Sequence, residues 1–521
     1  MRWVAPIVVG VTAAFAGASA FAGWDYNRFA AKARGRRSTA FDLGGTEPTP
    51  IDHRVAELTR ESRGRSGLLL LASNLDAFAA RALSARSAGR SLDLMYYIWH
   101  GDLTGRLLAA EALAAADRGV RVRFLLDDLG VSGDDRVMLA LDSHPNIELR
   151  LFNPTRARAN PVRRAAEMLL RAWSVNRRMH NKAWIVDGRL AIVGGRNVGD
   201  EYYDASESSN FRDLDLLCLG PAVTESEKVF DTYWNSGVAL PIGKLAKGIV
   251  RPRLKRVRAQ LQRVAGSREA KPYLDRLKSH MALEGLLDHA AVHWCDKVEI
   301  VSDCPEKAAG RDDGNRVMDY LLPVMEAAIE RLEITSPYFI PGDRGVESLT
   351  ELRRRGVQVA VLTNSLAATD VAAVHGGYAP YRKPLLEAGV ALFELKPDGR
   401  SPSLTLRGSS RASLHTKAFA VDGRHGFIGS LNFDPRSSSL NTEMGILFTS
   451  PVLVQRMSEL FNEETDPAMS YAVALDEGGK LCWTAEKEGE KSALYESEPD
   501  AAVGRRLLAT VVGWLPLESQ L

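Results

Sequence analysis

The sequence predicts an α/β protein made of two tandem domains of the same fold, each a mixed sheet flanked by helices. Three observations predict it. Strand-like and helix-like stretches alternate along the chain, the alternation occurs twice in the same order, and each copy carries the same polar motif at a matching place. We expect the two domains to pack as a pseudo-twofold pair, with the active site at their interface.

Four apolar runs mark the expected strands of the first domain, assigned to residues 41–240, and four runs in the same order mark those of the second, assigned to 297–465. The matched pairs are 67–74 with 297–303, 91–99 with 331–339, 118–128 with 355–365, and 147–154 with 390–397. Because the order repeats and not only the motif, a duplication of the whole domain is the simplest explanation.

The composition is that of a globular protein large enough for two cores. The chain has 521 residues, 45% hydrophobic and 25% charged. Its net charge of +2 does not indicate a nucleic-acid partner for the chain as a whole, although local clusters of basic residues remain possible. The four cysteines lack the paired short spacing of a zinc site, and we expect no cofactor.

The N-terminal segment, residues 1–40, is predicted to be hydrophobic with a short linker. Residues 3–23 carry no charge and, at about 1.5 Å per residue, could just cross the apolar core of a bilayer. The run Ala18-Ser19-Ala20 also has the form of a signal cleavage site. An uncleaved anchor favours a cytoplasmic body, whereas cleavage would export it. Both alternatives place the chain at a bacterial membrane and leave its side open.

Two regions are rich in basic residues. The segment 241–296 between the domains is strongly basic, and a second cluster from Arg156 to Arg178 is interleaved with apolar residues such as Leu169 and Trp173. One interpretation is a solvated helix face; the other is a surface held against anionic lipid, at about 1 kcal/mol per cation. The tail, residues 466–521, ends in an amphipathic stretch with the same two interpretations.

The repeated motif is His-x-Lys-(x)4-Asp-(x)6-Gly-(Gly/Ser)-x-Asn. Its two copies are His180, Lys182, Asp187, Gly194, Gly195 and Asn197, and then His415, Lys417, Asp422, Gly429, Ser430 and Asn432. Each histidine lies two residues before its lysine on a β-branched and aromatic run, so both side chains point to one face. Each aspartate precedes a glycine where two strands meet. We assign both aspartates as catalytic, with a structural hairpin turn as the alternative.

Two imidazoles and two ammonium groups that meet across an interface make a pocket suited to a phosphate diester. The lysines can neutralise the non-bridging oxygens, and Asn197, Asn432 and Ser430 are the predicted substrate-binding residues. A metal is not expected, since a lysine beside each histidine would repel a cation.

One histidine can attack phosphorus while the other protonates the leaving oxygen, which requires one neutral and one charged imidazole. Two carboxylates, Asp213 and Glu443, follow the motifs within apolar runs. We expect them to orient the histidines and to set their charge.

The two motifs resemble those of the phospholipase D superfamily, and the resemblance extends from about residue 66 to 460. It implies two phospholipase D-like domains, with His180 and His415 as nucleophile and acid/base. It also implies phosphate binding by the two motif lysines and asparagines. Gly195 departs from the serine usual in this family, which Ser430 matches.

Longer segments, among them DLMYYIWHGDLTGRLL and GSLNFDPRSSSLNTEMG, are similar to bacterial cardiolipin synthases, most closely the C type. That similarity implies transfer of a phosphatidyl group from a phospholipid, either phosphatidylglycerol or phosphatidylethanolamine, to phosphatidylglycerol. It also suggests lipid-pocket residues, for each of which core packing is the alternative: Tyr96, Tyr97, Trp99, His375, Tyr378 and Arg382.

Three other functions compete with the synthase. A phospholipase D hydrolase would use the same residues with water as acceptor. A nuclease of the superfamily would need a basic, aromatic-lined groove, and an inactive membrane scaffold would not need two intact motifs. The sequence identifies neither the donor lipid nor a protein partner.

Overall fold

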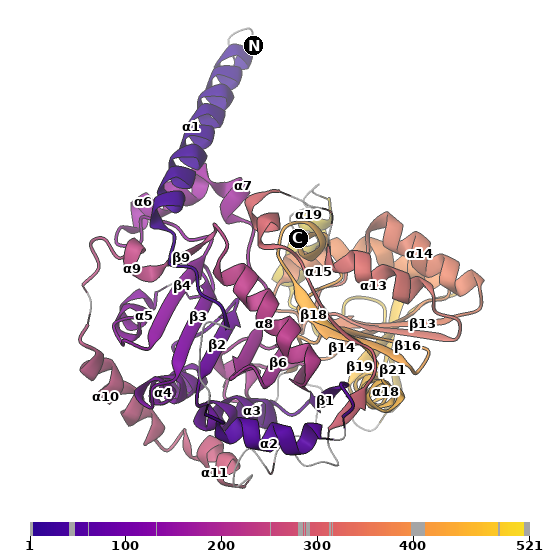
Figure 1. Cartoon of the computed structure of the whole chain (residues 1–521). Helices are drawn as coiled ribbons and strands as arrows, with labels where there is room; N and C mark the ends of the chain where they lie inside the picture. Colours follow the sequence, from indigo (N-terminus) through magenta and orange to yellow (C-terminus); the bar gives the residue numbers. More distant parts are fainter. Residues whose placement is uncertain are drawn as a thin grey trace.

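The structure is a computed structural model that describes residues 4–514 except 41–46, 61, 132, 251, 280–284, 286, 288–291, 312–313, 315, 398–411 and 488–489. Two large mixed sheets flanked by helices stand next to each other (Figure 1). The first is built from the indigo-to-magenta part of the chain and the second mainly from the orange-to-yellow part. The predicted α/β class and the two-domain duplication are confirmed.

The first sheet has nine strands in the order β10-β1-β8-β6-β5-β2-β3-β4-β9. Only β2, β3 and β4 are parallel to one another. The strands are β1 (Ser66–Leu71), β2 (Ser91–Tyr96), β3 (Arg121–Asp127), β4 (Ile147–Phe152), β5 (Ala183–Val186), β6 (Leu190–Gly194), β8 (Asp215–Leu219), β9 (Ala239–Pro241) and β10 (His293–Cys295). The main helices of this half are α2 (Pro50–Thr59), α3 (Asn74–Ser87), α4 (Leu103–Asp117), α5 (Asp135–Leu141) and α8 (Pro221–Trp234).

The second sheet repeats that arrangement in the order β11-β18-β17-β16-β12-β13-β14-β19, then adds β20 and β21. Its strands are β11 (Val298–Ser302), β12 (Arg331–Thr335), β13 (Gln358–Asn364), β14 (Ala391–Leu395), β16 (Ala418–Val421), β17 (His425–Gly429), β18 (Met444–Thr449), β19 (Ser470–Leu475), β20 (Leu481–Lys487) and β21 (Glu490–Tyr495). Its helices are α13 (Val317–Glu326), α14 (Gly342–Arg354), α15 (Ala372–Tyr378), α16 (Arg382–Glu387), α17 (Pro435–Ser439) and α18 (Pro451–Thr465).

The structure moves two of the predicted boundaries. In the segment 241–296, α10 (Leu254–Ala265) and α11 (Lys271–Ser279) pack on α4 and α3, and β10 pairs with β1, so its described residues belong to the first domain. Beyond residue 465, β19 to β21 continue the second sheet, and α19 (Val503–Trp514) packs on α15. The described part of the predicted tail is therefore part of the second domain.

The two halves share one apolar core. Side chains of β5, β6 and β8 pack there with side chains of β16, β17 and β18, among them Ile185, Val193, Ile428 and Ile446. A two-stranded parallel sheet also joins the halves, with β7 (Asn210–Arg212) from the first and β15 (Ala412–Leu414) from the second. This contact brings the two motifs together.

The N-terminal segment is helical. Helix α1 (Val4–Ala33) projects from the body and is held at its base, where Tyr26, Ala30 and Ala33 are buried (Figure 1). Within the described part of the chain, no helix has the length and apolar character needed to cross a membrane.

Candidate active site

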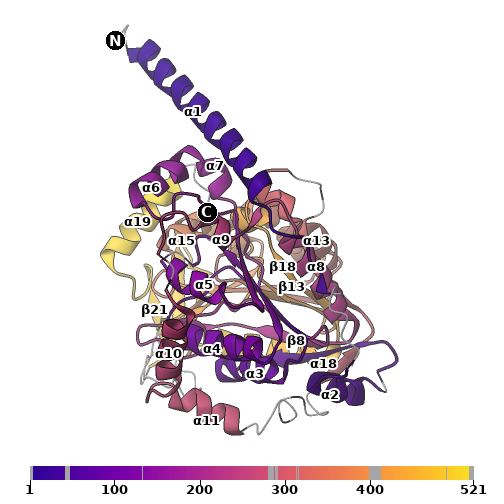
Figure 2. The same cartoon turned by 60° about the vertical axis from the view of Figure 1, so that its left-hand side comes forward.

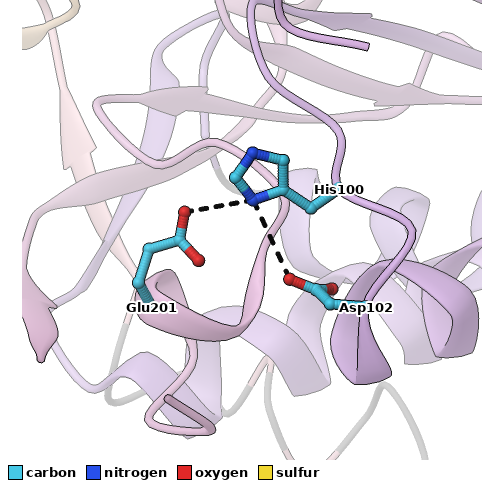
Figure 3. Close-up of side chains that lie close together, drawn as sticks. All are labelled: His100, Asp102 and Glu201. Atoms are coloured by element: carbon cyan, nitrogen blue, oxygen red, sulfur yellow. Dashed lines mark ion pairs between the residues drawn. The ribbon is translucent and has the colours of Figure 1, made fainter. Parts of the chain in front are cut away.

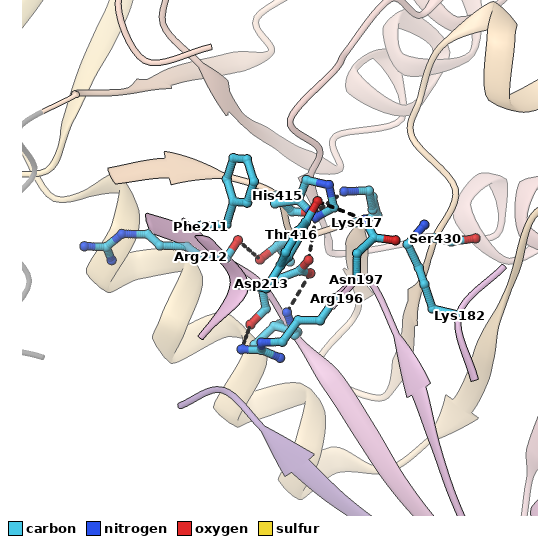
Figure 4. A network of polar contacts seen from close by, with 12 residues as sticks. Lys182, Arg196, Asn197, Phe211, Arg212, Asp213, His415, Thr416, Lys417 and Ser430 are labelled. Atoms are coloured by element: carbon cyan, nitrogen blue, oxygen red, sulfur yellow. Dashed lines mark hydrogen bonds and ion pairs between the residues drawn. The ribbon is translucent and has the colours of Figure 1, made fainter. Parts of the chain in front are cut away.

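The two motif histidines lie at the interface between the halves, and each is paired with a carboxylate from the other half. His180 Nδ1 is 2.8 Å from Glu443 Oε2, and His415 Nδ1 is 2.5 Å from Asp213 Oδ2 (Figure 4 shows the second pair). Both carboxylates are brought to the imidazoles as the sequence predicted, but the pairing crosses the interface.

The backbone explains the crossing. The N–H of His180 donates to Thr442 O at 2.8 Å, and the N–H of His415 donates to Arg212 O at 2.8 Å. Thr442 and Arg212 directly precede the two carboxylates in sequence. Because each motif strand pairs with the segment leading into the other half's carboxylate, the carboxylate follows the strand to the opposite imidazole.

The hydrogen bonds also fix a tautomer. His180 Nδ1 lies 3.0 Å from the carbonyl oxygen of Ser430, which can only accept, so Nδ1 carries hydrogen and Nε2 is left for chemistry. Burial, together with the charges of Lys182 and Lys417, holds the pKa of both imidazoles well below the ordinary value. Both rings are therefore poised to be neutral when no anion is bound.

The two lysines are buried beside the histidines. Lys182 Nζ donates to His180 O at 2.5 Å, and Lys417 Nζ donates to His415 O. Burial lowers the pKa of Lys182 to about 7 and that of Lys417 to about 8. Burial also raises the pKa of Glu443 to about 7. The pocket thus holds several groups that exchange protons near neutral pH, an arrangement found at catalytic centres.

Comparison with known proteins identifies this arrangement. The family model "Cardiolipin synthase, PLD-like domain" matches residues 84–234 and 321–465, which include both motifs and both carboxylates. The chain belongs to this family. It is a phospholipase D-type enzyme that transfers phosphatidyl groups.

Relatives support the match over most of the chain. Cardiolipin synthase C of Escherichia coli is 40% identical over 478 residues, covering 89% of this chain and 98% of that protein. A cardiolipin synthase of Staphylococcus aureus is 24% identical over 380 residues, covering 73% of this chain and 63% of that protein. Phosphatidylserine synthase of Haemophilus influenzae, a solved structure, has a TM-score of 0.51 at 13% identity over 88% of this chain and 96% of that one, which shows a shared fold.

The two motif asparagines are not equivalent in this phosphatidyltransferase. Asn197 accepts from the N–H of Ile98 at 3.1 Å and donates to Tyr202 Oη at 2.8 Å, so its amide braces two loops. Asn432 Oδ1 is buried without a hydrogen-bond partner among the described residues. Because an amide oxygen can only accept and is costly to leave unpaired when buried, a donor such as a hydroxyl of the lipid headgroup can satisfy Asn432 Oδ1, whereas a phosphate oxygen cannot.

The departure at Gly195 has a steric reason. A Cβ at this position would lie 2.1 Å from Asp213 Oδ1, which leaves no room for a serine. In the other half, Glu443 has one methylene more, and Ser430 Oγ donates to its Oε2 at 2.5 Å. Gly195 with Asp213 and Ser430 with Glu443 are therefore two matched solutions to the same contact.

The assignment of Asp187 and Asp422 as catalytic residues is corrected by the structure. Each aspartate lies in the turn after its motif strand, at the end opposite the histidine and lysine, with a positive φ. Asp187 accepts from the N–H groups of residues 89–91 at 2.7–2.8 Å, and Asp422 accepts from those of residues 329–331 at 2.8–3.0 Å. Both fix the start of a neighbouring strand, which is the structural alternative.

Of the six suggested lipid-pocket residues, only Tyr97 has a ring contact with a motif histidine, with its ring centroid 5.1 Å from that of His180. Tyr96 and Trp99 are buried in the apolar core of the first half. The other three, His375, Tyr378 and Arg382, are buried in the second half, where Arg382 forms ion pairs with Glu394 and Glu498. Core packing is therefore the role of these five.

Sequence reasoning missed two aromatic neighbours of His415. The ring centroids of Tyr202 and Phe211 lie 5.1 and 5.0 Å from that of His415. Together with Tyr97 they form an aromatic wall around both imidazoles. Their position shortly after the first motif was the available signal, but nothing in the sequence shows that they reach the other half.

Two clusters of the described residues have the geometry of a metal site, and neither includes a motif histidine. In the cluster of His100, Asp102 and Glu201 (Figure 3), His100 Nδ1 is 3.2 Å from Glu201 Oε1. Asp102 already accepts from the N–H groups of Gly105 and Asp200. The second cluster is His375, Glu394 and Glu498, which Arg382 neutralises.

Proposed function

We propose that this enzyme makes cardiolipin by transferring a phosphatidyl group to the headgroup hydroxyl of phosphatidylglycerol. The supporting observation is that both histidine–carboxylate pairs are complete in a chain that is 40% identical to a cardiolipin synthase over 98% of that protein's length. The donor is phosphatidylglycerol, with phosphatidylethanolamine as the second candidate.

In the first step, neutral His180 attacks phosphorus through Nε2. The N–P bond forms, the bond from phosphorus to the headgroup oxygen breaks, and His415, which the bound phosphate anion and Asp213 keep protonated, gives its proton to that oxygen. Glu443 stabilises the charge that develops on His180, and Asp213 does the same for His415. The crossed backbone pairing, which brings each carboxylate to the opposite imidazole, supports these proposed roles.

In the second step, His415 removes the proton from the hydroxyl of a phosphatidylglycerol molecule, whose oxygen attacks phosphorus as the N–P bond breaks. Lys182, Lys417 and the amide nitrogen of Asn432 donate to the phosphate, and the lysines neutralise the charge of the five-coordinate transition state. Asn197 and Ser430 fix neighbouring parts of the pocket through their hydrogen bonds, Asn197 to Ile98 and Tyr202 and Ser430 to Glu443. The products are cardiolipin and, with phosphatidylglycerol as donor, glycerol.

We also propose that the protein acts at the bacterial cell membrane, because both substrates are membrane lipids. The hydrolase alternative differs only in the acceptor. The apolar and aromatic surroundings of the histidines favour a lipid hydroxyl over water. A nuclease function has little support, since three aromatic rings and buried lysines do not make an open basic groove.

The decisive experiment is product analysis. Vesicles of labelled phosphatidylglycerol, with and without phosphatidylethanolamine, would be incubated with the full-length protein, and the lipids would be measured by mass spectrometry. We expect much more cardiolipin than phosphatidic acid among the products. Release of ethanolamine would show that phosphatidylethanolamine also serves as donor. Phosphatidic acid as the main product at high phosphatidylglycerol would show a hydrolase instead.

A further inference from the structure

Helix α6 (Pro161–Leu170) and the short helix α7 (Ala172–Val175) present three large apolar side chains to solvent, whereas Val175 of α7 is buried. No residue of α6 is buried, and Val162, Leu169 and Trp173 are 78%, 62% and 82% exposed. Val162 and Leu169 are seven residues apart and share one side of α6, and Trp173 lies on α7 directly after it. An amphipathic helix on a globular protein normally turns this side inward, so α6 is inverted.

The polar side of α6 is the side that faces the protein. Arg164 lies 3.3 Å from the buried carboxylate of Asp128, and Glu167 accepts from the backbone N–H groups of Arg156 and Ala157 at 2.9 and 3.0 Å. These contacts fix the orientation of the helix. The outward position of its apolar residues is therefore built into the fold.

Helix α19 buries Ala509 and Val512 against the protein but exposes other apolar side chains. Val503, Leu507 and Leu508 are 81%, 65% and 48% exposed. Its two arginines point to the protein, where Arg505 donates to Leu366 O at 2.9 Å and Arg506 donates to Glu498 O at 2.6 Å.

The two helices lie at the same end of the body. Figures 1 and 2, which differ by a turn about the vertical axis, both place α6, α7 and α19 at the end from which α1 projects. The base of α1 packs on α6, where Arg171 stacks on Tyr26 and Arg156 lies 2.7 Å from Asp25. Above this contact, Phe21 and Trp24 of α1 are exposed.

That end of the molecule is also the active-site end. The parallel strands β4 and β13 lead from their carboxyl ends to α6 and α15, and α15 carries α19. The motif histidines precede β5 and β16. These strands are antiparallel to β2 and β12, so they begin where the parallel strands of each sheet have their carboxyl ends. Between α7 and the pocket, only residues 176–179 intervene before His180.

We propose that Val162, Leu169, Trp173, Val503, Leu507 and Leu508 form one docking surface, here called the α6–α19 surface, which seats the active-site end on an anionic phospholipid bilayer. This inference rests on the proposed function, because lipid substrates must reach the histidines from a membrane. Exposed Arg28, Lys32 and Arg163 border the surface and complement anionic headgroups. Exposed apolar side chains with basic residues beside them are typical of proteins that bind at the membrane interface.

The test measures docking separately from catalysis. A fluorescent, polarity-sensitive label would be attached in the full-length protein at Leu169→Cys and, separately, at Leu507→Cys. We expect a blue shift of both labels with phosphatidylglycerol vesicles and a weaker response with phosphatidylcholine vesicles. The control is Ile329→Cys, which is 74% exposed but lies beside the Asp422 turn at the opposite edge of the second sheet.

Activity supplies the second readout. The double variant Leu169→Ser with Leu507→Ser should lower turnover of vesicle phosphatidylglycerol about tenfold, because two partly exposed apolar side chains no longer enter the bilayer. Turnover of a short-chain, monomeric phosphatidylglycerol should not change, and Ile329→Ser should affect neither rate.

The outcomes separate the two proposals. Labels that do not respond to vesicles overturn the docking surface even if cardiolipin is made. Labels that respond to rising protein concentration without lipid would show that a second copy of the chain covers these helices, which also overturns it. Labels that respond in a protein yielding only phosphatidic acid would support docking while refuting the synthase.

Discussion

The two histidines occupy equivalent places but have unequal neighbours. Glu443 accepts from both His180 and Ser430, whereas Asp213 meets His415 without a serine because Gly195 stands at that position. Ser430 donates to the same Glu443 oxygen that faces His180, whereas the second donor to Asp213, the N–H of Leu214, binds the oxygen away from His415. Sharing one oxygen makes Glu443 a weaker partner for a proton on His180. This asymmetry favours His180 as the neutral nucleophile and His415 as the acid.

Both imidazoles should be essential. His180→Ala and His415→Ala are each expected to lower turnover by at least about a thousandfold, because the two-step transfer needs one nucleophile and one acid/base. A quench of the wild-type reaction should trap the phosphoryl group on His180. Finding it on His415 would reverse the roles, and activity within a few fold of wild type in either variant would refute the mechanism.

The steric argument at position 195 predicts unequal effects of exchanging the two residues. Gly195→Ser should abolish activity, since its Cβ would displace Asp213, whereas Ser430→Gly should lower the rate only about tenfold by removing one hydrogen bond to Glu443. Both variants should be assayed alongside circular dichroism to verify folding. Equal losses in the two variants would contradict the argument.

The lysines predict a pH dependence. The pKa of Lys182 is lowered to about 7 and that of Lys417 to about 8, so both lose their charge as pH rises through this range. Because kcat/KM reports the free enzyme, we expect its value for a soluble substrate to fall as pH rises above about 7 and to fall more steeply above about 8. A bound phosphate stabilises the ammonium form and raises both pKa values, so kcat should fall only at higher pH. If kcat and kcat/KM fell over the same alkaline pH range, the proposed effect of bound phosphate on the lysine pKa values would be ruled out.

At the scale of elements, the turns that contain Asp187 and Asp422 fasten the hairpins β5–β6 and β16–β17 to β2 and β12. Each carboxylate joins three backbone N–H groups that no helix or strand would otherwise pair. These aspartates recur in the motif because the hairpin must be held in register for the histidine at its other end.

Replacement of either aspartate should therefore affect stability and not chemistry. Asp187→Ala is expected to lower the free energy of unfolding by about 1–3 kcal/mol, because it leaves buried N–H groups without an acceptor. Asp422→Ala should lower it by less, because the N–H groups that Asp422 accepts from are exposed to solvent. Thermal denaturation measures the change. A large loss of turnover at low temperature, without a fall in Tm, would restore the catalytic assignment.

At the scale of the whole molecule, the active site exists only when the halves are joined. Each half supplies one lysine and one histidine, and each histidine depends on a carboxylate from the other half. The shared core and the β7–β15 pair hold this arrangement. The positive charge for phosphate is therefore assembled by domain packing.

This source of charge predicts that chelators leave the chemical step intact. With a soluble diester substrate, EDTA should change the rate by less than about twofold, because Lys182 and Lys417 neutralise the phosphate. The soluble substrate is the control for effects of divalent ions on lipid packing. Loss of activity in EDTA that zinc or magnesium restores would contradict the prediction.

The sequence by itself determined the α/β class, the duplication and the two histidine–lysine motifs, because periodicity, repeated order and a motif are local properties of the chain. Only the tertiary structure decided that the carboxylates cross between the halves, since those pairs join residues more than 200 positions apart. It also decided the structural role of Asp187 and the outward apolar side of α6. A carboxylate or an amphipathic helix looks the same in sequence whichever partner it meets, and packing selects the partner.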